Sequence, residues 1–122
     1  MEKKRRVYLD NAATTKPAAA VVEAMLPFLT EEYGNPSGLY ELATNNKKAV
    51  NQARRQLAAL LGCDQRELFF TSGGTESDNW ALIGVAEQLE SKGKHIITSA
   101  VEHDAVRKSM EELERRGFEV TY

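Results

Sequence analysis

The chain contains 122 residues, of which 42% are hydrophobic and 28% are charged, and its formal net charge at pH 7 is -2. This composition predicts a globular protein, and scattered charges of both signs exclude the basic surface expected of a protein that binds nucleic acid or an anionic membrane. No stretch approaches the roughly 20 apolar residues of a membrane-spanning helix, and a single cysteine cannot form an internal disulfide, so we expect a cytoplasmic protein.

The first apolar segment, Val7–Leu9, gives no sign of a secretion signal. The basic run Lys3–Arg6 precedes it, but Asp10 follows at once and leaves no apolar core of the kind that signal peptides need. The polar and small residues at 10–15 are typical of a loop.

A first helix is expected after Pro17, because proline favours the first position of a helix. Val21, Met25 and Phe28 recur at three- and four-residue intervals and therefore share one apolar face. Pro27 is expected to kink or shorten this helix, since proline lacks the backbone N–H that a helix interior uses.

Residues 33–38 (YGNPSG) predict an ordered loop, because this run of turn-forming residues cannot extend a helix or a central strand. A second amphipathic helix is expected from about Glu41 to Leu61, where Val50 and Leu57 lie on one apolar face. Gly62 is placed as its C-terminal stop.

The second half of the chain alternates short apolar runs with longer helical patterns, which predicts a parallel sheet and an α/β fold. Helices normally cover both faces of such a sheet, and this layer looks unfinished, so we expect a longer parent protein. The expected elements are strands at Leu68–Thr71, at His95–Ser99 and from Phe118, with helices from Thr75 to about Ser91 and over Asp104–Arg116.

The turn Ser72-Gly73-Gly74-Thr75 joins the first predicted strand to the next helix. Glycines let a ligand approach the backbone, and a helix N-terminus offers unpaired N–H groups and about half a positive charge, so this turn suits a phosphate. Thr75 can add a hydroxyl donor, or it can cap the helix with Asp78 three residues later. The alternative is a turn in which the glycines serve geometry alone.

His103 follows the second predicted strand, at the edge where open α/β sheets bind their ligands. An imidazole at this place can stack on a flat ring or act as an acid or base. The alternative is a structural histidine that is hydrogen-bonded near Asp104 at the start of a helix. His95, which begins a predicted strand, is interpreted as structural.

Four blocks, in this order, resemble one family: residues 7–15 (VYLDNAATT), 34–37 (GNPS), 70–79 (FTSGGTESDN) and 102–103 (EH). Over essentially its whole length the sequence is similar to the NifS-like cysteine desulfurases, in the class V aminotransferase-like group. The resemblance implies the N-terminal part of an aspartate-aminotransferase-type fold, fold type I of the pyridoxal-phosphate enzymes. Residues 1–62 would contribute to its small domain, and residues 63–122 would begin its large, mainly parallel α/β domain.

The resemblance also implies a cofactor, pyridoxal 5'-phosphate. Gly74 and Thr75 match the turn that binds the phosphate group of this cofactor. His103 matches a histidine that packs over the pyridine ring and assists proton transfers, so it is the expected catalytic residue. No metal site is expected. A loop near the substrate pocket is matched by Asn11, Ala12 and Thr14.

As a function, the resemblance implies an enzyme that takes sulfur from L-cysteine, leaves L-alanine and holds the sulfur as a persulfide on an enzyme cysteine. An iron-sulfur scaffold or another acceptor protein then receives the sulfur, and the enzyme is implied to be a homodimer. In the family, the cofactor-binding lysine, an aspartate and the sulfur-carrying cysteine lie downstream of the residues matched here. We therefore expect the 122 residues alone to be inactive.

Other residues of a matching type are not assigned to these roles. Cys63 follows Gly62 and lacks the loop context of the family's sulfur carrier. The lysines expected on solvated helix ends are Lys92, Lys94 and Lys108.

The sequence departs from the commonest family pattern after Ser37, where a serine and then a histidine are expected and Gly38, Leu39 and Tyr40 stand instead. This departure affects the subgroup rather than the phosphate turn. Two alternatives stay open. One is a non-catalytic truncated module that binds phosphate or contributes to a dimer, and the other is the front part of a selenocysteine lyase or related aminotransferase.

Overall fold

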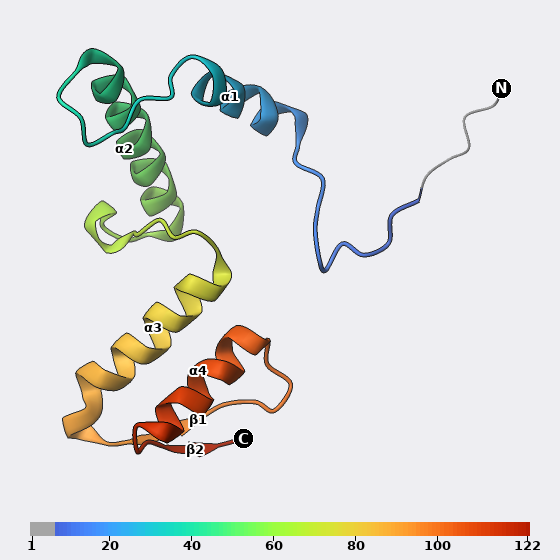
Figure 1. Ribbon diagram of the computed structural model, residues 1–122, viewed down its shortest axis with the longest axis vertical. Helices are drawn as coiled ribbons and strands as arrows, with labels where there is room; N and C mark the ends of the chain where they lie inside the picture. Colours follow the sequence, from blue (N-terminus) through green and yellow to red (C-terminus); the bar gives the residue numbers. More distant parts are fainter. Residues whose placement is uncertain (1–6) are drawn as a thin grey trace. The chain divides into compact units, whose positions relative to one another are not determined.

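The computed structural model describes residues 7–122, and the chain divides into two compact units, the first ending at Leu68 (Figure 1). The first unit contains two long helices, and the second contains two helices and a small sheet. The assignment of a small and a large domain, with a boundary near residues 62–65, stays a prediction. No helix within residues 7–122 is long and apolar enough to cross a membrane.

Helix α1 (Ala19–Thr30) forms where the apolar spacing predicted a helix, yet none of its residues is buried. Pro27 lies inside the helix, which continues to Thr30, and its carbonyl accepts the N–H groups of Glu31 (2.9 Å) and Glu32 (2.8 Å) just beyond the helix end. The helix therefore presents an exposed surface, which we call the α1 apolar face, formed by Val21, Met25, Phe28 and Leu29.

Helix α2 (Glu41–Leu61) has the predicted bounds, and Gly62 ends it in the left-handed conformation (φ 70°). The preceding loop is tied to the helix by Asn46, a buried residue whose Nδ2 donates to the carbonyl oxygens of Gly34 (2.8 Å) and Leu42 (3.1 Å). A Cβ on Gly34 would lie 2.8 Å from the Leu42 side chain, so glycine allows this close approach of loop and helix.

In the second unit, α3 (Gly74–Leu89) packs against α4 (Asp104–Arg115). Strands β1 (His95–Ile97) and β2 (Glu119–Thr121) form a two-stranded parallel sheet with Ile96 paired to Val120. One short 3-10 helix, η2 (Glu90–Lys92), follows α3, and another, η1 (Gln65–Glu67), closes the first unit. The core consists of Met110, Leu113 and Phe118, with Leu82, Ile83, Ala86, Ile96 and Val120 packed against it.

The strand predicted at Leu68–Thr71 is wrong for this structure. Leu68 has an extended backbone (φ -103°, ψ 123°), but residues 68–71 pair with no strand in the described part of the chain. An apolar run forms a strand only when a neighbour completes its hydrogen-bond ladder, and sequence alone does not supply that neighbour. The other two strands form, and both are shorter than predicted.

Candidate functional site

The glycine turn is open at the start of α3. Gly73 is the N-cap residue, Gly74 is the first helical residue, and no side chain caps this end of the helix. A Cβ built on either glycine would meet nothing within 4 Å, so the space beside the turn is free. The backbone of Gly73 is extended (φ 163°), so here the glycines provide access rather than a left-handed conformation.

Hydroxyl and carboxylate groups fix the turn to the first helical turn of α3. Glu76 Oε2 accepts from the backbone N–H of Ser72 (2.6 Å) and from its hydroxyl (2.7 Å). These two hydrogen bonds, the hydroxyl first, hold the pKa of the Glu76 carboxyl below its ordinary value. The hydroxyl oxygens of Thr71 and Ser77 lie 2.6 Å apart, so the loop before the glycines is joined to the helix twice.

The Thr75 hydroxyl is available to a ligand. The sequence left open whether it caps α3, and the structure excludes this, because Gly73 occupies the N-cap position and Thr75 lies in the first turn. The side chain is exposed, and its hydroxyl has no hydrogen-bond partner among residues 7–122. The first-turn N–H groups of a helix lack intrahelical acceptors and carry a partial positive charge. Open glycines, these N–H groups and one free hydroxyl together fit a phosphate group.

His103 is the N-cap residue of α4. Its Nδ1 accepts the backbone N–H of Ala105 at 3.1 Å, and the residue is exposed. The structural alternative from the sequence is therefore present in the structure, since His103 starts a helix through a hydrogen bond. Nε2 has no hydrogen-bond partner within the described residues, which leaves one ring nitrogen available to a ligand.

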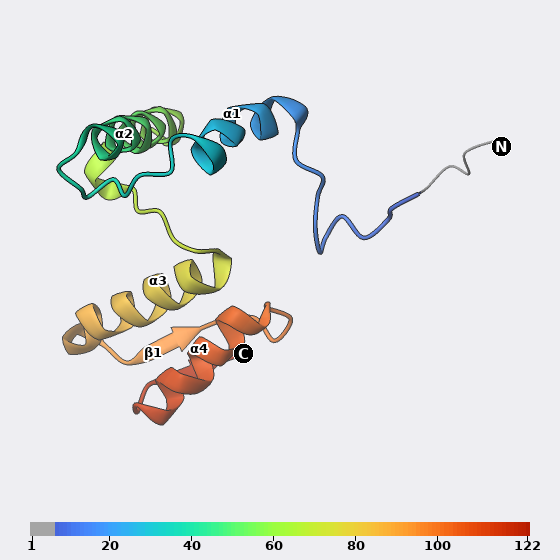
Figure 2. The same cartoon turned by 45° about the horizontal axis from the view of Figure 1, so that its top comes forward.

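Both candidate elements belong to one end of the second unit. Figures 1 and 2 show that α3 and α4 begin at the end toward which β1 runs. This is the carboxyl edge of the parallel sheet, where α/β proteins bind their ligands. The structure thus brings the Gly74–Thr75 turn and His103 to the same edge, as the order of the predicted elements required.

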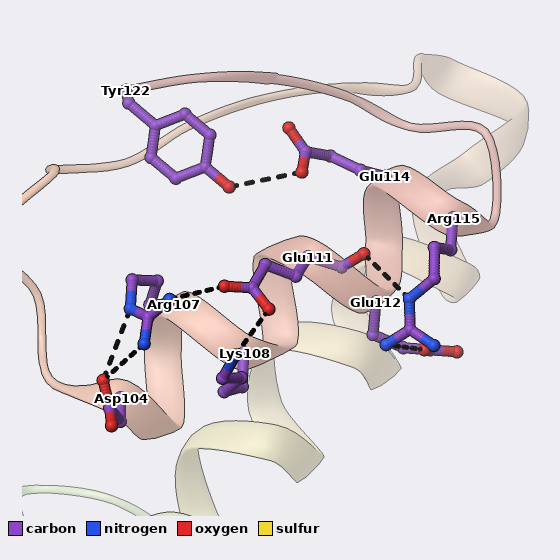
Figure 3. A network of polar contacts seen from close by, with 8 residues as sticks. All are labelled: Asp104, Arg107, Lys108, Glu111, Glu112, Glu114, Arg115 and Tyr122. Atoms are coloured by element: carbon purple, nitrogen blue, oxygen red, sulfur yellow. Dashed lines mark hydrogen bonds and ion pairs between the residues drawn. The ribbon is translucent and has the colours of Figure 1, made fainter.

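The remaining α4 side chains form a charged network on its outer surface (Figure 3). Arg107 pairs with Asp104 (2.9 Å) and with Glu111 (2.6 Å), and Lys108 pairs with Glu111 (2.8 Å). The Arg107 hydrogen bond is the main cause of a lowered Asp104 pKa. Tyr122 donates to Glu114 (3.4 Å), and desolvation followed by this carboxylate raises the Tyr122 pKa. Each of these charged groups is paired with a neighbour in the same unit, so this surface gives no sign of a ligand site.

Other residues considered from the sequence lie apart from this edge or have local partners. His95 Nε2 lies 2.8 Å from the Thr121 hydroxyl, across the two strands, in agreement with a structural role. Lys94 pairs with Glu90 and lies over the Phe118 ring, 5.5 Å from its centroid. Cys63 is half-buried in the first unit. No cluster of three or more His, Cys, Asp or Glu suited to a metal ion occurs within residues 7–122.

The polar loop at 11–14 has its own internal order. The N–H groups of Ala13 (3.2 Å) and Thr14 (3.4 Å) donate to the Asp10 carbonyl, and the Thr14 hydroxyl lies 2.6 Å from the Tyr8 hydroxyl. The expected contribution of Asn11, Ala12 and Thr14 to a substrate pocket is not tested by these contacts and stays a prediction.

A family model described as aminotransferase class-V matches residues 7–122. The chain belongs to this family. Among its curated relatives, the cysteine desulfurase IscS of Methanosarcina thermophila is 55% identical over 118 residues, which cover 97% of this chain and 29% of that protein. The cysteine desulfurase IscS of Dictyoglomus turgidum is 52% identical over 119 residues, covering 98% of this chain and 30% of that protein. The chain therefore spans about 30% of the length of these relatives.

Solved structures give the same assignment. A NifS-like protein superposes with a TM-score of 0.89 at 42% identity, over 97% of this chain and 32% of that one. A structure of SspA in complex with cysteine superposes with a TM-score of 0.82 at 39% identity, over 91% and 32% of the two chains. The predicted resemblance to NifS-like cysteine desulfurases and the predicted fold class, the N-terminal portion of fold type I, are confirmed.

Two parts of this candidate site were not found from the sequence. One is the link from Glu76 back to Ser72, and the other is the contact of the Ala105 N–H with His103. A signal for the first is present, because an acidic residue in the first turn often bonds the chain just before the helix. For the second, the sequence predicted a hydrogen-bonded histidine at the start of a helix as one alternative, but it did not identify the Ala105 N–H as the donor.

Proposed function

We propose that the protein to which this chain belongs is a pyridoxal-phosphate-dependent cysteine desulfurase. The observation that carries this proposal is the 55% identity to a cysteine desulfurase IscS over nearly the whole chain. The open glycine turn supports it independently, because it fits the phosphate group of the cofactor. The chain spans about 30% of that relative, so the activity is proposed for the whole protein.

In this proposal, the Gly74 backbone and the Thr75 hydroxyl hold the phosphate of pyridoxal phosphate at the N-terminus of α3. When bound, this cofactor supplies an electron sink that stabilises negative charge on the substrate Cα. His103 faces the cofactor ring from the start of α4 and exchanges a hydrogen bond or a proton with the reacting groups. Glu76 keeps the loop in place through Ser72 and does not contact the phosphate.

The proposed substrate is L-cysteine, and the products are L-alanine and sulfur held as a persulfide for delivery to an iron-sulfur scaffold or another acceptor protein. A solved relative, SspA, is described in complex with cysteine, which supports this substrate. We also propose a cytoplasmic homodimer as the working state, with the 122 residues alone inactive. The relatives' lengths support this last point, because about 70% of each lies outside the matched region.

The test is made on the complete reading frame that contains these residues. Purified protein is expected to absorb visible light as pyridoxal-phosphate enzymes do, and to release L-alanine from L-cysteine in equal amount to the sulfur transferred. A colourless protein that cannot be loaded with the cofactor overturns the proposal. Release of alanine from selenocysteine but not from cysteine supports the lyase instead.

Replacing Thr75 by valine tests the phosphate site directly. Thr75→Val removes one hydroxyl at nearly constant volume, and loss of a hydrogen bond to a charged group costs about 1.5–3 kcal/mol, or roughly 10- to 150-fold in cofactor affinity. Equilibrium dialysis of the cofactor measures this change. Ser91→Ala, which removes an exposed hydroxyl just beyond the other end of α3, is the control and should leave the affinity unchanged. Equal affinities of wild type and Thr75→Val would remove Thr75 from the site.

A further inference from the structure

The imidazole of His103 is engaged on one side only. Nδ1 accepts the Ala105 backbone N–H at 3.1 Å, whereas Nε2 has no hydrogen-bond partner within residues 7–122. The side chain is exposed, so Nε2 is the nitrogen that a ligand at this edge of the sheet can reach. The two nitrogens therefore have different roles in the fold.

This hydrogen bond decides which nitrogen carries the proton of the neutral ring. A neutral imidazole has one nitrogen that donates and one that accepts. A backbone N–H can only donate, so Nδ1 must be unprotonated while it accepts from Ala105. The proton of the neutral ring then lies on Nε2. A proton on Nδ1 would set two donors against each other and would break the hydrogen bond.

The donor is held firmly in place. Ala105 is 4% exposed, and its carbonyl accepts the hydroxyl of Ser109 at 2.8 Å. Ser109 is itself completely buried, so this end of α4 cannot easily shift away from His103. The neighbouring carboxylate of Asp104 is bonded to Arg107 at 2.9 Å rather than to the imidazole. Within residues 7–122, no other donor forms a hydrogen bond with Nδ1.

We propose that the first turn of α4 fixes His103 as the tautomer with its proton on Nε2, with Ala105 as the positioning residue. Toward a ligand, His103 is then a hydrogen-bond donor, and it does not accept a proton at Nε2 unless the bond to Ala105 breaks. The identity of the ligand rests on the proposed function, but the tautomer does not. Within that function, this assignment selects hydrogen-bond donation from Nε2, because both the acid and the base role that the sequence left open would need a change of protonation that breaks the bond to Ala105.

Nuclear magnetic resonance of the imidazole nitrogens tests the tautomer without reference to activity. The 122-residue chain has two histidines, so in the variant His95→Gln the imidazole nitrogen signals come from His103 alone. At about pH 8, where an ordinary imidazole is neutral, we expect the Nδ1 signal of an unprotonated nitrogen and the Nε2 signal of an N–H. The opposite assignment, or averaged signals for both nitrogens, overturns the proposal.

Two substitutions separate the two sides of the ring. His103→Asn retains an acceptor for the Ala105 N–H, because asparagine is a preferred N-cap residue, but it removes the Nε2 donor. His103→Gln reaches toward the Nε2 position with an amide donor and is not a preferred cap. Hydrogen exchange of the Ala105 N–H should stay slow in wild type and Asn, and should be about tenfold faster in Gln. Equal exchange in all three proteins contradicts the assigned bond.

The same pair distinguishes failure of this inference from failure of the proposed function. In the complete cofactor-loaded protein, His103→Gln should release alanine faster than His103→Asn does. This order is the reverse of the order expected for protection of the Ala105 N–H from hydrogen exchange. If the tautomer and the exchange rates are as expected but neither variant changes cofactor binding or activity, the inference stands and the proposed function of His103 fails. If Asn is the more active variant, donation from Nε2 is excluded.

Discussion

Glu76 holds the candidate phosphate turn in shape through Ser72. Its carboxylate accepts both the N–H and the hydroxyl of Ser72, which ties the loop to the first turn of α3. A carboxylate at this position also interacts favourably with the positive end of the helix. The turn is therefore held in shape while Gly74 and Thr75 keep their N–H and hydroxyl groups free.

This interaction predicts a specific dependence of stability on pH. The pKa of Glu76 is lower in the folded than in the unfolded state, so its contribution is complete above the ordinary glutamate range and is lost as the pH falls through the folded pKa. Wild type should therefore lose more stability than Glu76→Gln between about pH 5 and 3. Urea unfolding followed by fluorescence of Trp80, the single tryptophan, measures this difference.

Glu119→Gln is the control for that experiment, because Glu119 is an exposed residue of the same unit. It should retain the acid sensitivity of wild type. An equal pH dependence in wild type and Glu76→Gln would show that the link to Ser72 is absent in solution.

Asn46 is the corresponding residue of the first unit. It is 5% exposed, and its amide satisfies the carbonyl of Gly34 in the loop and that of Leu42 within α2. Asn46→Ala leaves a loop carbonyl without its donor and should cost about 1–3 kcal/mol. Urea unfolding followed by far-ultraviolet circular dichroism measures the loss.

The neighbouring Asn45 is exposed, so Asn45→Ala is a matched control with an expected change within about 0.5 kcal/mol. A similar loss in both variants would show that the bond to Gly34 does not set the effect, because alanine favours a helix more than asparagine does and should not by itself destabilise α2.

At the scale of elements, α4 supplies the core of the second unit and also carries the candidate histidine. Leu113 is 0% exposed and Met110 is 1% exposed, and both lie on the inner face of α4. The outer face of α4 carries the charged network, so its inner face packs in the core and its outer face forms ion pairs. His103 caps this same helix, so the packing of α4 also fixes the position of the His103 backbone.

Leu113→Ala should therefore cost about 2–5 kcal/mol, because it removes buried methyl groups and leaves a cavity. The loss is measured by urea unfolding with Trp80 as the probe. Val101→Ala, at a position that is 91% exposed in the same unit, should change stability by no more than about 0.5 kcal/mol. A loss below 1 kcal/mol for Leu113→Ala would indicate that α4 is not packed on the sheet as described.

At the scale of the whole molecule, the main feature is the solvent-exposed α1 apolar face. Leu29 is 70% exposed and Met25 is 51% exposed on the α1 apolar face. Large exposed apolar patches drive association or aggregation. We expect concentration-dependent association of the 122-residue chain, measured by sedimentation velocity, and we expect Met25→Lys with Leu29→Lys to reduce it.

Glu23→Gln is the control for this prediction, because it also changes charge on α1 without adding a charge to the apolar face. It should associate as wild type does. Association that is unchanged in the double lysine variant would locate the contact on another surface.

Several elements were predictable because local physics defines them. The bounds of α2 follow from its apolar spacing and from Gly62, which alone tolerates the left-handed end of the helix. The start of α3 follows from the glycines, and both candidate positions, the Gly74–Thr75 turn and His103, were placed at helix starts by the strand-helix order. The predicted strand at 68–71 failed because a strand depends on a partner and not on its own residues.

The sequence by itself determined the family and the helix positions, and it predicted the residues of the candidate site, because motifs and apolar periodicity are local properties of the chain. Only the tertiary structure decided that Thr75 does not cap α3, that Glu76 reaches back to Ser72 and that Ala105 bonds to Nδ1 of His103. Each of these outcomes depends on which donor meets which acceptor after the backbone has folded. Hydrogen bonds have strict distance and direction requirements, and residue types along a sequence do not encode them.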